Sequence, residues 1–258
     1  MKALGRIRAR ILAAVARACA RVILPCRQTI GTNVREVESV ALNGPVCILV
    51  PHPDDEVIGC FHFMKRVAQS AAIDLIYVTD DPDKPLADLR RAEAIRATSG
   101  IPVRSRIWWG YADGRLQSQE DQLRHGVDQF HERYCYVLCP APSDLTPDHA
   151  VLAAWAQESV PPDKLLWYRS TWLTFPLRSA DLVASGDALE KLAALREFTS
   201  QGSLALENVI STSRYEARAI GLGASSIEGF RFASSGAVDV QPVNALSVLW
   251  PWMLRGWL

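Results

Sequence analysis

One imidazole and three carboxylates occur within the five positions from His52 to Glu56, directly after the apolar run Val46 to Val50. Imidazole and carboxylate groups together suit Zn²⁺, Mn²⁺ or Fe²⁺. Like charges crowded this closely destabilise a fold unless a cation compensates them, so a loop that merely caps the next helix is the weaker interpretation. The residue types therefore predict a divalent-metal site, which needs at least one more ligand from elsewhere in the chain.

The apolar run before this cluster predicts where the cluster lies. The run shows no polar alternation, as is typical of a strand that is covered on both faces of a sheet. Pro51 and Pro53 prevent the strand from continuing. The polar cluster is then expected at the carboxyl end of a buried strand, where open α/β sheets bind their ligands.

Apolar runs and helical patterns alternate along the middle of the chain. The expected strands are 46–50, 74–79, 105–109, 134–139 and 165–168, and the expected helices are 57–70, 86–98, 118–133 and 148–158. This α/β alternation predicts a Rossmann-like three-layer α/β/α sandwich with a mainly parallel sheet. Right-handed crossovers would bring together the loops that follow the strands, at 51–56, 80–85, 110–116 and 140–149.

The stretch CILVPHPDDEVIGC, residues 47–60, resembles the signature of the PIG-L/LmbE-like zinc-dependent N-deacetylases. Further segments resemble other motifs of that family in the same order along the chain: Arg90 to Glu93 with Gly100, Gly110 to Leu116, Pro147 to His149, and Lys191 to Gln201. Together the motifs cover about residues 45–232. The resemblance implies an enzyme that removes acetyl groups from N-acetylglucosamine-type sugars.

The resemblance also implies a role for each residue of the predicted metal site. His52, Asp55 and His149 would be the metal ligands, with Zn²⁺ as the expected metal and Mn²⁺ or Fe²⁺ as alternatives. Asp54 resembles the general base that accepts a proton from the attacking water. The alternative for His149 is a histidine at a helix start that binds no metal.

Four more residues are expected around this centre. Arg90 and Asp113 match positions that look like contacts to sugar hydroxyls or to the acyl side of the substrate, although Arg90 could instead be a solvated helix charge. Glu56 is expected behind the ligands at a helix N-terminus, where the macrodipole favours a carboxylate. Asp148 is expected to orient a ligand histidine.

Thr146 departs from the family pattern, which commonly has a histidine three residues before the third ligand. That histidine helps to stabilise the oxyanion or supplies a proton, whereas a hydroxyl donates one hydrogen bond and cannot become cationic. Loss of an oxyanion donor typically lowers a rate by about 10²–10³-fold. Either another group replaces the histidine, the enzyme is slow, or this loop aligns differently.

Composition sets broader limits. The 258 residues, 49% of them hydrophobic, suit one large domain, and a net charge of zero indicates no nucleic-acid partner. Six cysteines lack paired Cys-x-x-Cys spacing and are expected as free thiols, which favours a cytoplasmic protein. Motifs of nucleotide-cofactor enzymes and serine hydrolases are absent from the sequence. The oligomeric state is left open.

The two ends differ from the middle. Residues 1–35 contain eight basic residues and no acidic one, with apolar residues at helical spacing, which predicts a basic amphipathic helix. Residues 236–258 form an apolar, tryptophan-rich tail that is too short to span a bilayer. Both segments suit peripheral contact with the inner face of a membrane. The alternative for both is packing on the expected deacetylase domain, residues 36–235. A third hypothesis, for residues 1–35 only, is a transit peptide.

These observations lead to one main functional hypothesis. We expect a metal-dependent deacetylase of an N-acetylated amino sugar carried by a lipid-linked sugar, or by a glycolipid or polysaccharide precursor. A soluble deacetylase of a small glycoconjugate is the second enzymatic alternative. A catalytically weak sugar-binding protein of the same fold is the third, because Thr146 replaces a catalytic histidine.

Overall fold

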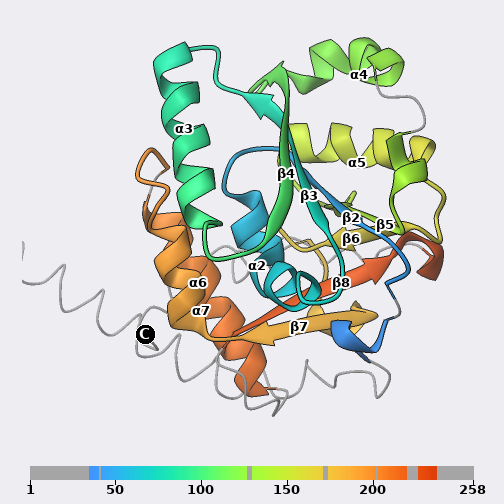
Figure 1. Ribbon diagram of the computed structural model, residues 1–258, viewed down its shortest axis with the longest axis vertical. Helices are drawn as coiled ribbons and strands as arrows, with labels where there is room; N and C mark the ends of the chain where they lie inside the picture. The colour runs from blue at the N-terminus through green and yellow to red at the C-terminus, as the bar shows by residue number, and fades with distance from the viewer. Residues whose placement is uncertain are drawn as a thin grey trace, which may run out of the picture.

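The computed structural model describes residues 35–40, 42–126, 130–170, 174–201, 203–219 and 226–236. These residues form one mixed sheet of eight strands with helices on both faces (Figure 1). The predicted α/β sandwich is therefore confirmed. The predicted N-terminal helix and the tryptophan-rich tail lie outside the described residues, apart from Arg35 and Gly236 at their inner ends.

The sheet has the strand order β1-β7-β8-β6-β5-β2-β3-β4. Its strands are β1 (Arg35–Glu36), β2 (Val46–Val50), β3 (Ile73–Asp80), β4 (Val103–Ala112), β5 (Tyr136–Pro140), β6 (Leu165–Tyr168), β7 (Leu182–Gly186) and β8 (Ser226–Phe232). The α-helices are α2 (Asp55–Val67), α3 (Lys84–Ala97), α4 (Glu120–Gly126), α5 (Pro147–Ser159), α6 (Ala188–Leu195) and α7 (Ser203–Ala219). Short 3₁₀ helices are Val37–Ser39, Leu116–Gln119, Phe130–Arg133, Leu177–Ser179 and Ala233–Ser235.

Strand β2 lies inside the sheet, parallel to β3 on one side and to β5 on the other. Antiparallel pairing is confined to β8, which joins β6 to β7. Parallel strands end at the same edge, so the loops after β2, β3, β4 and β5 meet there. This edge is where the sequence predicts the site.

The core divides into two layers, one on each face of the sheet. Val46, Ile48 and Val50 pack toward α2, α3 and α6, whereas Cys47 and Leu49 pack toward α4 and α5. Figure 1 shows the same division, with α2, α3, α6 and α7 on one side and α4 and α5 on the other. A strand that is buried on both faces explains why its sequence is apolar throughout.

Two features of the fold differ from the expectations. The single helix predicted over 118–133 is wrong at both ends: Leu116–Gln119 and Phe130–Arg133 are 3₁₀ helices, and α4 is described over Glu120–Gly126. Strands β7 and β8 were not predicted. Strand β8 carries charged residues, among them Glu228, in a central position of the sheet.

An ion pair inside the protein attaches α6 and β8 to α2. Lys191 Nζ donates to Glu228 Oε1 (2.6 Å) and to the carbonyl oxygen of Ile58 in α2 (2.7 Å). The Glu228 carboxylate accepts hydrogen bonds from the backbone N–H groups of His62 (3.0 Å) and Phe63 (3.1 Å). Lys191 and Glu228 are 1% and 4% exposed, so α2 is held by contacts that water does not reach.

Two further expectations concern cysteines and membranes. Cys47, Cys60, Cys135 and Cys139 are free thiols, and all but Cys135 are fully buried, as predicted. Among the helices of the described residues, none is long and apolar enough to cross a bilayer.

Candidate active site

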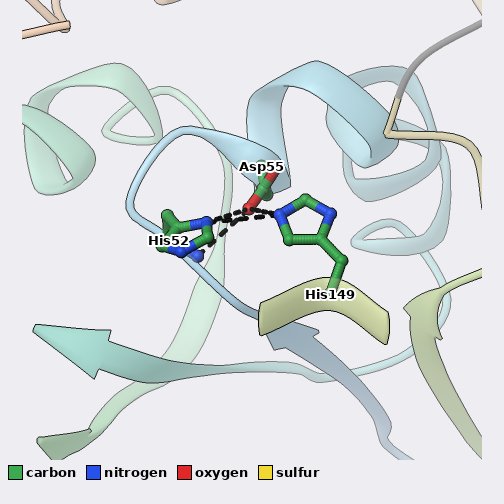
Figure 2. Close-up of side chains that lie close together, drawn as sticks. All are labelled: His52, Asp55 and His149. Carbon is green, nitrogen blue, oxygen red and sulfur yellow. Dashed lines mark hydrogen bonds and ion pairs between the residues drawn. The ribbon is translucent and has the colours of Figure 1, made fainter. Parts of the chain in front are cut away.

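Three predicted ligands converge at the carboxyl edge of the sheet (Figure 2). His52 lies in the loop after β2, Asp55 is the first residue of α2, and His149 lies in the first turn of α5. Asp55 Oδ2 is 3.0 Å from His149 Nε2 and 3.5 Å from His52 Nδ1, and the two imidazole nitrogens are 3.2 Å apart. Two nitrogens and one oxygen facing a common point are a donor set that fits a divalent metal with an open coordination position.

The second ring nitrogen of His52 faces two carboxylates. His52 Nε2 is 3.1 Å from Asp148 Oδ2 and 3.3 Å from Asp113 Oδ1. This triplet could itself hold a cation. Asp148, however, already accepts hydrogen bonds from the backbone N–H groups of Gly114 (2.7 Å) and Leu116 (3.1 Å). We therefore assign Asp148 as the hydrogen-bond partner that orients His52.

His149 has a corresponding partner that the sequence analysis missed. Its Nδ1 atom lies 2.8 Å from Asp144 Oδ2, and Asp144 is buried, with Ser170 as a further donor to the same oxygen. The other oxygen of Asp144 accepts a hydrogen bond from the backbone N–H of Thr146 at 2.9 Å. A carboxylate five positions before a ligand histidine was the available signal, because both follow the same strand.

The carboxylates raise the pKa values of both histidines. Burial alone would lower the pKa of His52, but hydrogen bonds to Asp113, Asp148 and Asp55 outweigh it and raise this pKa to about 12. Burial is likewise outweighed at His149, where Asp55 and Asp144 raise the pKa to about 10. Burial also opposes ionisation of Asp55, yet the two histidines lower its pKa. The carboxylates around the two histidines thus stabilise positive charge at this site.

Asp54 lies beside the ligands in an unusual backbone conformation. Its φ of 134° makes it the only non-glycine residue with positive φ in the described part of the chain. Such a conformation typically costs of order 1–3 kcal/mol, so the surroundings must enforce it. The Glu56 carboxylate accepts a hydrogen bond from the Asp54 backbone N–H (3.0 Å) and another from the Tyr77 hydroxyl (3.0 Å). Glu56 therefore fixes the turn that presents Asp54.

The carboxyl group of Asp54 has a raised pKa. Burial is the main cause, and the neighbouring charges of Asp55 and Glu56 raise it further, against the opposing effect of His52. Glu56 has a pKa raised to about 7, mainly by burial. A carboxylate whose pKa is raised in this way accepts a proton more readily, as a general base requires.

A cavity of about 310 Å³ opens beside the ligands. It brings together Asp54, Arg90, Asp113 and Thr146, which the sequence predicted for the site, with Gln201, which was noted only as part of a motif. His52, Gly114, Pro147 and Asp148 complete the lining. Chain segments from four loops therefore form one cavity next to the metal-binding donor set.

Arg90 and Asp113 form an ion pair at the cavity. Arg90 Nη1 lies 2.5 Å from Asp113 Oδ2 and 3.5 Å from Asp81 Oδ2. The hydrogen bond from His52 is the main reason that the pKa of Asp113 is lowered to about 2, with Arg90 contributing. Arg90 is thus held in place by carboxylates and is not a solvated helix charge.

Thr146 and the tryptophans have less defined roles. Thr146 is the N-cap of α5 and lines the cavity, but its side chain makes no capping hydrogen bond. Trp108 stacks on Tyr77 with a centroid distance of 4.0 Å, and neither it nor Trp109 lines the cavity. Neither tryptophan is therefore placed to contact a sugar in this cavity.

Comparisons with known proteins agree with this geometry. The family model PIG-L: GlcNAc-PI de-N-acetylase matches residues 47–160, which include all three predicted ligands. Among curated proteins, none matches the chain. Solved structures that share the fold include the conserved protein TT1542 from Thermus thermophilus, with a TM-score of 0.60 and 22% identity over 74% of this chain and 94% of that chain.

Two other solved structures show how different the named activities on this fold are. N,N'-diacetylchitobiose deacetylase from Pyrococcus horikoshii has a TM-score of 0.56 and 22% identity, over 77% of this chain and 89% of that chain. GalB, the 4-carboxy-2-hydroxymuconate hydratase from Pseudomonas putida, has a TM-score of 0.52 and 14% identity, over 78% and 100%. Such distant likeness shows a common fold and leaves the reaction to the site. By its sequence, the chain carries a PIG-L family domain at residues 47–160.

Proposed function

We propose that the protein is a metal-dependent hydrolase that removes the acetyl group from an N-acetylated amino sugar of the N-acetylglucosamine type. The observation that carries this proposal is the convergence of His52, Asp55 and His149 beside Asp54 in one cavity. Three ligands and an adjacent base are the parts that amide hydrolysis needs. The PIG-L domain supports the reaction class.

His52, Asp55 and His149 are the residues that would hold the metal, with Zn²⁺ as the first expectation from the donor types. When bound, such a metal supplies Lewis acidity, which polarises the acetyl carbonyl and makes water more acidic. Asp148 and Asp144 accept the outer N–H groups of His52 and His149, and so hold each imidazole with its inner nitrogen turned toward Asp55.

Asp54 moves the proton in this proposal. Its carboxylate accepts a proton as water attacks the amide carbon, and the same group returns the proton to the amine as the C–N bond breaks. The turn enforced by Glu56 keeps the Asp54 carboxylate at the cavity wall while Asp55 turns toward the histidines. Two adjacent carboxylates can therefore perform different tasks.

Thr146 and Arg90 are the residues of the cavity lining to consider as hydrogen-bond donors to the oxyanion. Within the described lining, Arg90 is the one permanently cationic side chain, and Asp113 and Asp81 already pair with it. Thr146 offers a neutral hydroxyl where the family commonly has histidine. We therefore propose a slower deacetylase than one with a histidine at this position.

The cavity limits the substrate that fits. A volume of about 310 Å³ is at the small end of the range of about 300–1,000 Å³ that is typical of small-molecule sites. It suits one sugar ring with its acetamido group, with any carrier outside. We still predict a lipid-linked carrier. This prediction depends on the basic amphipathic sequence of residues 1–35 and the tryptophan-rich sequence of residues 236–258, almost all of which lie outside the described residues.

The experiment that tests the proposal measures acetate release by the full chain, loaded with Zn²⁺. Substrates are free N-acetylglucosamine and N-acetylglucosamine linked to polyprenyl diphosphate, phosphatidylinositol, nucleotide diphosphate or a small alcohol. We expect release from at least one of them, abolished by Asp54→Asn. Gln69→Glu, a change at an exposed residue of the turn that follows α2, is the control for handling and folding.

The alternative is a catalytically weak sugar-binding protein, which the exposed threonine at position 146 favours. Binding of N-acetylglucosamine without acetate release, at full metal occupancy, would support this alternative and contradict the enzyme.

A further inference from the structure

Gln201 reaches the cavity from a part of the chain that lies beyond the family match. It follows α6 in the turn that precedes α7, and its side chain lines the cavity with His52, Asp54 and Arg90. Its Nε2 atom donates to the carbonyl oxygen of Pro53 at 3.4 Å, near the limit for a hydrogen bond. Within the described residues this is the only partner of the Gln201 amide.

The turn that carries Gln201 is fastened by one buried carboxylate. Glu93 accepts three hydrogen bonds, from Thr199 Oγ1 (2.6 Å), from the Ser200 backbone N–H (2.9 Å) and from Ser200 Oγ (2.6 Å). Glu93 is completely buried. These hydrogen bonds are the main reason that its pKa is lowered despite its burial. A carboxylate with this many donors defines the position of the turn closely.

Helix α3 therefore shapes two walls of the cavity. Arg90 and Glu93 are three residues apart, so they lie on the same face of the helix. Arg90 reaches the cavity directly, while Glu93 holds the turn that brings Gln201 to it. The network has no contact with the metal-binding atoms, so it is available for another task.

We propose that Gln201 is a substrate-binding residue, which contacts a ring hydroxyl of the amino sugar, and that Glu93 is a positioning residue that acts through Ser200. This inference rests on the proposed function. A primary amide both donates and accepts hydrogen bonds, which matches a neutral hydroxyl. The long contact to Pro53 is weak enough for a hydroxyl to replace, and the amide oxygen faces no competing donor among the described residues.

The test compares Gln201→Leu with the wild type in acetate release and in binding of glucosamine, the product sugar, to the metal-loaded protein. A contact that is equal in the ground state and the transition state raises KM and leaves kcat almost unchanged. We expect KM and the glucosamine Kd to rise by up to about tenfold, the upper end of what the loss of one hydrogen bond to a neutral group causes. Metal content and Tm should stay at wild-type values, and Gln69→Leu is the matched control.

Deoxy sugars identify the contact. The analogues are N-acetylglucosamine molecules that lack the 3-, 4- or 6-hydroxyl. We expect the wild type to bind one of them about tenfold more weakly than it binds N-acetylglucosamine. Gln201→Leu should bind that analogue and N-acetylglucosamine equally well. Ser200→Ala, milder than a change of buried Glu93, should raise KM by a smaller factor. In the Ser200→Ala/Gln201→Leu double variant the effect of Ser200→Ala should disappear, because both act through one side chain.

The outcomes separate this inference from the proposed function. Acetate release by the wild type, together with unchanged KM and Kd in Gln201→Leu, overturns the inference alone. Raised KM with lost metal or a lowered Tm also overturns it, because the role would then be structural. A wild type that neither binds nor deacetylates any of the sugars overturns the proposed function, and the inference with it.

Discussion

The two sides of the cavity are built differently. On the metal side, each histidine has its own carboxylate partner, Asp148 for His52 and Asp144 for His149, and both carboxylates are buried. On the substrate side, Thr146 makes no side-chain capping bond and Gln201 makes one long contact. Donor atoms are thus fixed in place where the chemistry would occur, whereas Thr146 and Gln201, on the side that would face the sugar, keep unused hydrogen-bonding capacity.

This difference indicates which property each side controls. Rigid, fully bonded groups keep a metal and a base in register, and their loss removes the reaction. Groups with unused capacity can exchange one partner for another, so their loss changes affinity or rate gradually. The following predictions test this contrast from the largest expected effect to the smallest.

The largest effect is expected at the adjacent carboxylates. Asp54→Asn should retain the metal and lose about 10²–10⁴-fold in kcat, because a general base contributes about that much. Asp55→Ala should lose both metal and turnover, since it removes a donor atom that both histidines face. Elemental analysis and acetate release on the same samples provide the measurement; the opposite pattern would mean that the two roles are exchanged.

Metal uptake should depend strongly on pH. The raised pKa values of His52 (about 12) and His149 (about 10) mean that the metal-free site holds protons near neutral pH. A metal must displace them, so apparent affinity should rise with pH, by up to about a hundredfold per unit if two protons leave. Competition with a chelator at pH 6, 7 and 8 measures this. An affinity that is independent of pH would show that the histidines are not ligands.

Asp144→Asn tests the support behind the metal side. Loss of a carboxylate that orients a ligand histidine typically lowers metal affinity or activity by about 10–100-fold. We expect weaker metal binding with the fold intact, measured by chelator competition and by Tm in excess metal. The control is Asp187→Asn, at the exposed N-cap of α6. If Asp144→Asn and the wild type bind the metal with equal affinity, Asp144 does not orient His149 for metal binding.

The smallest effects are expected at Thr146. Thr146→Ala should lower kcat by at most about tenfold, because a neutral hydroxyl contributes one ordinary hydrogen bond. Thr146→His should raise kcat by about tenfold, since an imidazolium is a stronger donor to a developing oxyanion. If neither variant changes kcat, this loop is not at the reaction centre and another group stabilises the intermediate.

The run of parallel strands β6-β5-β2-β3-β4 and the convergence of the three candidate ligands were predictable from sequence for the same reason. Val46 to Val50 is apolar because it is buried on both faces, and strands β2 and β6 have the predicted bounds. The imidazole of His52 and the carboxylates that follow it come directly after this strand, and a metal site is one of the few structures that explains such a cluster. The candidate ligand His149 could be located because it also follows a strand of the same parallel set.

The parts that could not be predicted depend on contacts distant in sequence. Glu228 gives β8 the composition of an exposed segment, and only its pairing with Lys191 makes a buried strand possible. Gln201 reaches the cavity because Glu93 holds its turn, which no local pattern shows. Asp144 was identifiable in principle, but a carboxylate in a polar loop has many ordinary explanations.

The ion pair between Lys191 and Glu228 also bears on how the protein is made. Helix α2 begins at the metal site, yet the partners of its His62 and Phe63 amides come from a strand that is synthesised much later. At about 5–20 residues per second the nascent chain waits on the order of ten seconds or more for Glu228. We therefore expect the proposed metal site to form late in synthesis, and a fragment limited to residues 47–160 should not form a stable one.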